Sequence, residues 1–357
     1  MNQQAEDLAP DVTVVIPTRD RAALVREAIE SCFAGNDDVA VEVVVVDDGS
    51  TDETPALLEP LSDRVLVLRQ EAQGPQVARN CGLAAARGRY VKFLDDDDFL
   101  VPGALSRQVR HLVLTGADAS VGDVQEVDGG GRLLQLLRQP AWDDAPATIL
   151  AMRLFPHPFA YLYRRSAIAD RRWDPALPFK QDVAFLLDGA ARGARFARLG
   201  EVVGCYRQHS GPRVCVVNLP RQVESWSLLC DLIERATQVM EASGRLTPSR
   251  RLAAAQGMWV WAHLLSDVDI LGFERLFTRI QALSPGFRPR RAWPGGAVLD
   301  RVLGVSAVER LLCYRRRVAS VASRARRAAI GHARSEGTSN TPTSARGCPG
   351  ESDARVT

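Results

Sequence analysis

Four consecutive aspartates, Asp95–Asp98, directly follow the apolar segment Tyr90–Leu94, whose composition predicts a buried strand. Carboxylates two residues apart on an extended segment point the same way, so Asp95 and Asp97 could face one site. Their oxygens suit hard divalent cations such as Mg²⁺ or Mn²⁺. A solvated acidic turn before the next helix is the alternative, but the position after a buried strand favours a metal site.

A second polar cluster, Asp47–Asp52, follows the valine-rich segment Val41–Val46. It lacks the glycine spacing of a dinucleotide-binding loop and of a phosphate loop. A carboxylate at a strand end can accept hydrogen bonds from a base N–H or a ribose hydroxyl. We expect Asp47 or Asp48 to contact a nucleotide; helix capping alone is the alternative. In the nearby predicted helix, Arg79 could contact a phosphate or pair with an aspartate, and both readings stay open.

The elements that position these residues alternate between strands and helices. This alternation predicts a doubly wound α/β fold with a mainly parallel sheet and helices on both faces, and ligands of such sheets bind at the carboxyl ends of the strands. The strands are expected at Val12–Ile16, Val41–Val46, Val65–Leu68 and Tyr90–Leu94, and the helices at Arg21–Phe33, Asp52–Leu61 and Gln76–Arg87.

The composition narrows the class of protein further. Forty-five Lys and Arg residues against 43 Asp and Glu give a net charge of +2 over 357 residues, so no nucleic-acid partner is expected. No run approaches the roughly 18 apolar residues of a membrane span, and the N-terminus is unlike a signal peptide. The seven cysteines are scattered and odd in number, which favours reduced thiols. These observations predict a cytoplasmic protein.

Together the motifs resemble the family 2 glycosyltransferases with the GT-A fold. The resemblance spans about Asp11 to His209 and rests on four segments in order: Val14–Arg21, Val44–Asp52, Ala78–Gly82 and Gly88–Asp98. It implies transfer of a sugar, with inversion, from a UDP-, GDP- or dTDP-sugar to a glycan or lipid-linked acceptor in polysaccharide, lipopolysaccharide or glycolipid assembly. Arg19-Asp20 departs from the aromatic residue and Asn that the family commonly has.

The resemblance also implies roles for individual residues. Mn²⁺ or Mg²⁺ would be bound by Asp97, with Asp95 and His209 as further candidates. The nucleotide-sugar would be held by Pro17, Thr18, Asp20, Asp47, Asp48, Arg79, Asp95 and Asp96. Residues 1–10 would be a leader, 11–218 the catalytic domain (11–116 the nucleotide-sugar half, 117–218 the acceptor half), 219–330 a helical C-terminal region and 331–357 a disordered tail.

A catalytic base is implied by the segment Trp173–Asp182, which resembles the acceptor-side segment of the family. That segment usually ends in Glu-Asp, and here Gln181 replaces the glutamate. Asp182 is therefore the candidate that takes the proton of the acceptor hydroxyl. A plain carboxylate at a helix N-terminus is the alternative.

The region after residue 219 is expected to be helical. Trp226, Trp259 and Trp261 fall among apolar residues at helical spacing, which predicts core positions rather than a sugar platform. Residues 299–330 combine many arginines with apolar residues and could form a helix that lies on an anionic membrane surface. A solvated helix packed on the catalytic domain is the alternative.

Two other classes of protein remain as alternatives. A sugar nucleotidyltransferase would share the α/β layer and the metal, but Ile16–Asp20 matches its glycine-rich loop poorly. A non-catalytic carbohydrate- or partner-binding relative should have lost the metal motif or the base. Asp95, Asp97 and Asp182 are all present, so the sequence favours an enzyme.

Overall fold

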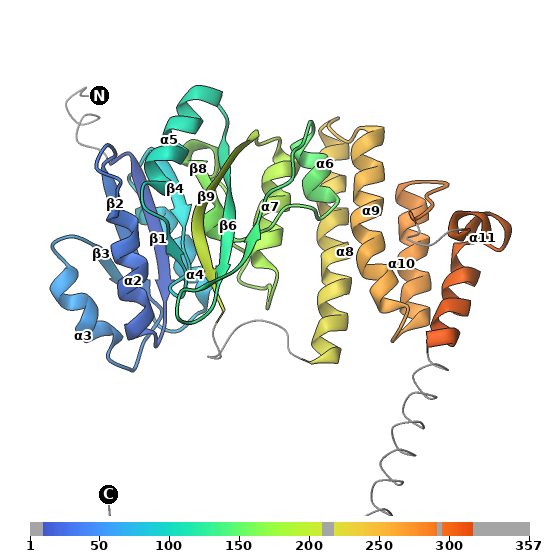
Figure 1. The fold of residues 1–357 in the computed structure, drawn as a ribbon, viewed down its shortest axis with the longest axis horizontal. Coiled ribbons are helices and arrows are strands. Elements are labelled where there is room, and N and C mark those ends of the chain that lie inside the picture. Colours follow the sequence, from blue (N-terminus) through green and yellow to red (C-terminus); the bar gives the residue numbers. More distant parts are fainter. Residues whose placement is uncertain (1–9, 209–217, 291–294, 317–357) are drawn as a thin grey trace, which may run out of the picture. The chain divides into compact units, whose positions relative to one another are not determined.

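The computed structural model describes residues 10–208, 218–290 and 295–316 (Figure 1). The first half of the chain alternates strands and helices, as expected from its apolar runs. Its elements are β1 (Val12–Thr18), α2 (Ala22–Phe33), β2 (Val41–Asp47), α3 (Thr54–Leu58), β3 (Leu66–Arg69), α4 (Pro75–Ala85) and β4 (Tyr90–Phe93).

Strands β3, β2, β1 and β4 are neighbours in that order and are parallel to one another. The register pairs Thr18 of β1 with Asp47 of β2, and Val15 of β1 with Phe93 of β4. All seven residues of β1 are buried, which explains why the strand is apolar without alternation. The carboxyl ends of β1, β2 and β4 therefore meet at one edge of the sheet.

Helices cover both faces of this sheet, as predicted. On one face α4 lies so close to β1 that a Cβ at Gly82 would come within 2.3 Å of Val15 Cγ1. On the same face Phe93 of β4 packs against Phe185, with ring centroids 5.7 Å apart. The opposite face carries α2, which contacts β1 and β2. Glycine at position 82 thus allows the close approach that brings α4 to the edge where β1 ends.

The first four strands are all parallel, as predicted, whereas the second half of the sheet is mixed and contains one parallel pair, β6 with β9. Strand β8 pairs antiparallel with β4 and β6, and β6 forms a hairpin with β7, whose tight turn requires antiparallel pairing. The elements are β5 (Phe99–Leu100), α5 (Ala104–Thr115), β6 (Ala119–Val127), β7 (Leu133–Leu137), α6 (Ala145–Leu150), β8 (Tyr161–Arg164), α7 (Gln181–Arg192) and β9 (Phe196–Arg207).

Three long helices follow: α8 (Leu219–Ala242), α9 (Pro248–Leu265) and α10 (Ile270–Leu283). Helix α8 packs against α7, α9 against α8 and α6, and α10 against α9 (Figure 1). Apolar residues of these helices, such as Ile233 and Met258, belong to the same hydrophobic core as the sheet. The compact unit therefore continues beyond the α/β part and ends at Arg290.

A second unit begins at residue 291 and contains α11 (Gly296–Val302) and a helical segment at 305–316. Several of its apolar side chains are exposed: Val298, Leu299, Val302, Leu303, Leu311 and Tyr314. No helix in the described parts of either unit is both long and apolar enough to cross a bilayer.

Candidate active site

A cavity of about 700 Å³ opens at the carboxyl ends of β1, β2 and β4, and this volume is in the range of small-ligand sites. It brings together residues that are more than 200 positions apart in the chain. The side chains that line it include eight of those predicted from the sequence: Pro17, Thr18, Asp48, Arg79, Asp95, Asp96, Asp97 and Asp182.

The aspartates after β4 have different surroundings. Asp96 is 9% exposed, and its Oδ2 accepts a hydrogen bond of 2.7 Å from Thr18 Oγ1. Burial raises the pKa of Asp96 to about 7, and the neighbouring Asp97 and Asp95 add to this rise. Asp98 points elsewhere, since its Oδ1 accepts from the backbone N–H of Arg207 at 3.0 Å. Asp95 and Asp97 remain as the partly exposed carboxylates of the cavity.

Two arginines lie against these carboxylates. Arg21 Nη1 is 2.5 Å from Asp97 Oδ2, and Arg79 donates a hydrogen bond to Asp95. The guanidinium of Arg79 also lies over the ring of Trp173, 4.6 Å from its centroid. For Arg79, the structure thus shows the pairing with an aspartate that the sequence left open. Arg21 is the last residue of the segment Val14–Arg21, but nothing in its local sequence indicated the contact with Asp97.

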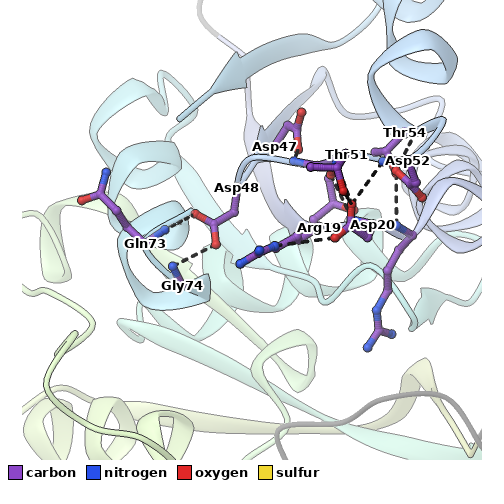
Figure 2. Close-up of polar contacts among 12 residues, drawn as sticks. Arg19, Asp20, Asp47, Asp48, Thr51, Asp52, Thr54, Gln73 and Gly74 are labelled. Atoms are coloured by element: carbon purple, nitrogen blue, oxygen red, sulfur yellow. Dashed lines mark hydrogen bonds and ion pairs between the residues drawn. The ribbon is translucent and has the colours of Figure 1, made fainter. Parts of the chain in front are cut away.

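Asp48 lines the cavity, whereas Asp47 does not. As Figure 2 shows, the carboxylate of Asp48 accepts hydrogen bonds from the backbone N–H groups of Gln73 and Gly74, both 2.8 Å long. Asp47 is 2% exposed and accepts from the backbone N–H of Ser50 at 2.8 Å. Asp48 thus lines the cavity and also holds the loop after β3, while Asp47 stabilises the turn after β2.

Asp20 is also placed outside the cavity lining. Its backbone has a positive φ of 51°, and its carboxylate accepts from the backbone N–H of Thr51 at 2.7 Å (Figure 2). This hydrogen bond is the main reason that the pKa of Asp20 is lowered. Asp20 joins the loop after β1 to the loop after β2, so its predicted contact with the nucleotide finds no support in this geometry.

Asp182 lies in the first turn of α7 and on the wall of the cavity. Its Oδ1 accepts a hydrogen bond of 2.8 Å from the backbone N–H of Val183. Burial raises the pKa of Asp182, although the charges of Lys180 and Arg79 counteract the rise. A carboxylate with a raised pKa is a stronger base than a solvated one, as general base catalysis requires.

Helix α4 holds the segment that leads to Asp182. Asn80 donates to the carbonyl of Trp173 at 2.8 Å and accepts from the backbone N–H of the same residue at 2.8 Å. Gln76 donates to the carbonyl of Leu177 at 2.7 Å. Lys180 then begins α7 with a positive φ of 62°, a backbone conformation that residues with a Cβ rarely adopt. One helix thus positions both Arg79 and the segment carrying Asp182.

Trp226 of α8 and Trp261 of α9 are partly buried and pack against the hydrophobic core, as predicted, but both also line the cavity. Trp259 does lie in the core, among Phe273, Phe277 and Phe287. Helical spacing predicts which residues face inward, but it does not distinguish a core from a cavity wall.

The residues that line the cavity fit a divalent cation that is also bound by the phosphates of a substrate. Asp95 and Asp97 offer two carboxylates, and Mg²⁺ is usually bound by one or two carboxylates together with substrate phosphates. Within the described residues, no group of three or more acidic, His or Cys side chains is arranged to hold a metal by itself. The other candidate ligand, His209, lies outside the described residues.

The fold is shared with solved structures. The chain is similar to residues 1–349 of TarS from S. aureus in complex with UDP-GlcNAc, with a TM-score of 0.61 and 18% sequence identity. The match covers 85% of this chain and 89% of that chain, so it includes the α/β part and helices beyond it. It confirms the predicted α/β fold with a helical extension.

The chain also has sequence relatives whose names describe glycan assembly. The chain is 38% identical to the succinoglycan biosynthesis protein ExoO of Rhizobium meliloti over 212 residues, which is 55% of this chain and 60% of the relative. It is 39% identical to a GalNAc(5)-diNAcBac-PP-undecaprenol beta-1,3-glucosyltransferase of Campylobacter jejuni over 102 residues, which is 27% of this chain and 33% of the relative. The chain thus spans less than two thirds of the length of these curated relatives.

The family model "Glycosyl transferase family 2" matches residues 13–177. This range contains β1, β2 and β4 together with the aspartates at their carboxyl ends, and it ends just before the segment that carries Asp182. Residues 13–177 of this chain are therefore similar to glycosyl transferase family 2.

Proposed function

We propose that the protein is an inverting glycosyltransferase, which moves a sugar from a nucleotide-diphosphate donor to an acceptor hydroxyl. The observation that carries this proposal is the composition of one cavity. Asp48, Asp95 and Asp97 lie at the strand ends, and a partly exposed carboxylate with a raised pKa, that of Asp182, lies on the wall formed by α7.

The donor would lie against the ends of β1, β2 and β4. Pro17, Thr18 and Asp48 would hold the nucleoside, because Asp48 offers carboxylate oxygens to base N–H or ribose O–H groups. Asp97 and Asp95 would hold a divalent cation, Mn²⁺ or Mg²⁺, which supplies charge compensation for the departing diphosphate. Arg21 and Arg79 would add positive charge at the same place. Residues 11–116 would thus form the nucleotide-sugar half and 117–218 the acceptor half.

In the transfer step, Asp182 would accept the proton of the acceptor hydroxyl. The acceptor oxygen forms a bond to the anomeric carbon while the bond between that carbon and the β-phosphate oxygen breaks. The electron pair of the broken bond leaves with the nucleoside diphosphate. Gln181 cannot replace Asp182 as the base, because an amide does not take up a proton at neutral pH.

We propose a glycan or a lipid-linked saccharide as the acceptor, in the assembly of a polysaccharide or glycolipid. The similarity to a succinoglycan biosynthesis protein supports this class of pathway. The second unit supports contact with an anionic membrane surface, because exposed apolar side chains such as Val302 and Leu311 lie among exposed arginines, Arg301, Arg310 and Arg315. Flotation with anionic and neutral liposomes tests the contact, and equal binding to both would contradict it.

A thermal-shift screen tests the donor class directly. The full chain is heated with UDP-, GDP- and dTDP-sugars in the presence of Mn²⁺, Mg²⁺ or EDTA. A ligand present at about 100 times its Kd adds about 2.7 kcal/mol to the free energy of unfolding. We expect one nucleotide class to raise the Tm with metal and not with EDTA, and Asp97→Ala to lose this effect. Absence of any nucleotide-dependent shift would contradict the proposal.

A further inference from the structure

The side of the cavity at the strand ends and the side formed by α8 and α9 differ in the hydrogen bonds and ion pairs of their polar groups. On the donor side, every carboxylate that lines the cavity accepts a hydrogen bond or pairs with an arginine. On the side formed by α8 and α9, the lining consists of two indole rings, Trp226 and Trp261, with polar groups from Gln222 and Ser225. The first side is a charged surface, whereas the second is aromatic and uncharged.

Two of the polar groups on the second side make no hydrogen bond within the described part of the chain. Ser225 is 4% exposed, and its hydroxyl makes no hydrogen bond to any residue that the structure describes. The Nε1 of Trp261 is buried and also has no hydrogen-bond partner in the described part of the chain. Leaving a buried donor such as this indole N–H unsatisfied destabilises the folded protein. The hydroxyl of Ser225, which lines the cavity and is not bonded to the described protein, is therefore available to a polar ligand.

Trp259 shows what a core tryptophan looks like in the same helix. Its ring lies 5.5 Å from that of His263 and 6.0–6.2 Å from three phenylalanine rings. Neither Trp226 nor Trp261 makes a ring contact with any residue that the structure describes. Their indoles face the cavity instead of other aromatic side chains.

The spacing of the lining residues of α8 places them on one face of the helix. Gln222, Ser225 and Trp226 stand at positions i, i+3 and i+4, which share one face of a helix. Helix α8 packs against α7, whose first turn carries Asp182. An aromatic surface with neutral hydrogen-bonding groups at its edge is therefore placed next to the carboxylate that we assign as the base.

We propose that the wall formed by α8 and α9 is a saccharide subsite for the acceptor. An apolar face of the sugar ring would stack on Trp226 or Trp261, and its hydroxyls would bond to Ser225 and Gln222. Neutral hydroxyls suit these groups, whereas a diphosphate suits the arginines and metal of the other side. The inference rests on the proposed function, because it takes the bound saccharide to be the acceptor.

Saturation-transfer NMR with the full chain tests the subsite without requiring turnover. Each sample contains Mg²⁺, one of UDP, GDP and dTDP, and a methyl β-glycoside of glucose, galactose, mannose or N-acetylglucosamine. Nucleotide and sugar protons give separate signals, so the two sites are observed independently. The variants are Trp226→Ala, Trp226→Phe and Ser225→Ala, and Trp259→Phe is the matched core control.

We expect at least one glycoside to receive saturation at its ring protons from the unmodified protein. Trp226→Ala should weaken its binding about tenfold, as loss of one stacked aromatic contact predicts, while Trp226→Phe and Trp259→Phe retain it. The nucleotide signal should be unchanged in all variants. No glycoside signal from the unmodified protein, or an equal signal from Trp226→Ala, would overturn the subsite. Loss of the nucleotide signal alone would instead contradict the proposed donor site.

Discussion

Arg21 Nη1 lies 2.5 Å from Asp97 Oδ2 and 3.9 Å from Asp96 Oδ1. The pair stands where the ends of β1 and β4 meet, and Arg79 makes the corresponding contact with Asp95. Each carboxylate that we assign to the metal is thus neutralised by an arginine. Adjacent carboxylates would otherwise repel one another in a partly buried place. A metal that binds here must compete with Arg21, whereas a bound diphosphate offers Arg21 another partner.

Substitution Arg21→Gln should therefore affect the affinities for the metal and for the diphosphate differently. Mn²⁺ alone should bind about as tightly as before or more tightly, because Asp97 is released from its ion pair. Binding of the nucleoside diphosphate with Mn²⁺ should weaken about tenfold, because a charged partner of the phosphates is lost. Isothermal titration calorimetry measures both affinities.

Arg110→Gln is a suitable control, since Arg110 forms an ion pair of 3.4 Å with Asp38 on the surface and does not line the cavity. It should leave both affinities unchanged. If Arg21→Gln weakened the binding of Mn²⁺ and of the diphosphate equally, Arg21 would only support the shape of the loop, and the competition described above would be wrong.

Substitution Asp182→Asn should abolish transfer and preserve donor binding. The amide keeps the size of the side chain but cannot take up the proton, and loss of a general base typically costs 10²- to 10⁴-fold in rate, as an order of magnitude. In the unmodified protein only the ionised form of Asp182 acts as the base. Since its pKa is raised by burial, transfer should fall with decreasing pH at a pH above the ordinary range of an aspartate. Initial rates between pH 4 and pH 8 (about the range in which such groups titrate) measure this limb.

Gln181→Ala provides the comparison for this experiment, because Gln181 is the neighbouring cavity residue and has no acid–base role. It should alter the KM of the acceptor at most and leave the position of the acidic limb unchanged. Transfer by Asp182→Asn at the rate of the unmodified protein would refute the assignment of the base.

The strand ends of this site could be predicted from the sequence because each is set locally. A valine run ends in Asp47-Asp48, and the parallel register then brings Asp48 near Thr18. The tryptophans of the cavity could not be predicted in this way. Trp226 and Trp261 reach the same cavity only because α8 and α9 pack side by side, and no local pattern encodes that packing.

Asp20 and Asp47 show a different limit of predicting binding residues from sequence. A carboxylate that accepts from backbone N–H groups of a turn has the same residue type and position as one that accepts from a nucleotide. Asp47 and Asp48 both accept from backbone N–H groups, and only the geometry shows that Asp48 also lines the cavity. This difference predicts that substitutions of Asp48 and of Asp20 have different effects.

Asp48→Asn should weaken nucleotide binding, whereas Asp20→Asn should lower the Tm and leave nucleotide affinity unchanged. Asp48 faces the cavity, and loss of its charge should reduce affinity about tenfold. Asp20 holds the loop of Thr51, so its contribution to stability is present above the ordinary pKa of an aspartate and is lost as the pH falls through its lowered pKa. Equal loss of affinity in the two variants, measured by calorimetry, would place Asp20 in the nucleotide site after all.

Lys92→Met should flatten the pH dependence of stability. Lys92 is 0% exposed, and Gln108 Oε1, 2.5 Å from Nζ, is its hydrogen-bond partner in the described structure. Burial lowers the pKa of Lys92 to about 7 from 10.5, so between these values the unfolded chain binds a proton that the folded chain lacks. The free energy of unfolding therefore rises with pH, by at most about 1.4 kcal/mol per unit. Urea unfolding is measured at about pH 7 to 8, because burial raises the pKa of Cys32 from 9.0 to about 12, and at higher pH the unfolded chain would lose a thiol proton that the folded chain keeps. Lys180→Met, which removes a partly exposed lysine, should keep the slope; an unchanged slope in Lys92→Met would show that Lys92 stays charged when folded.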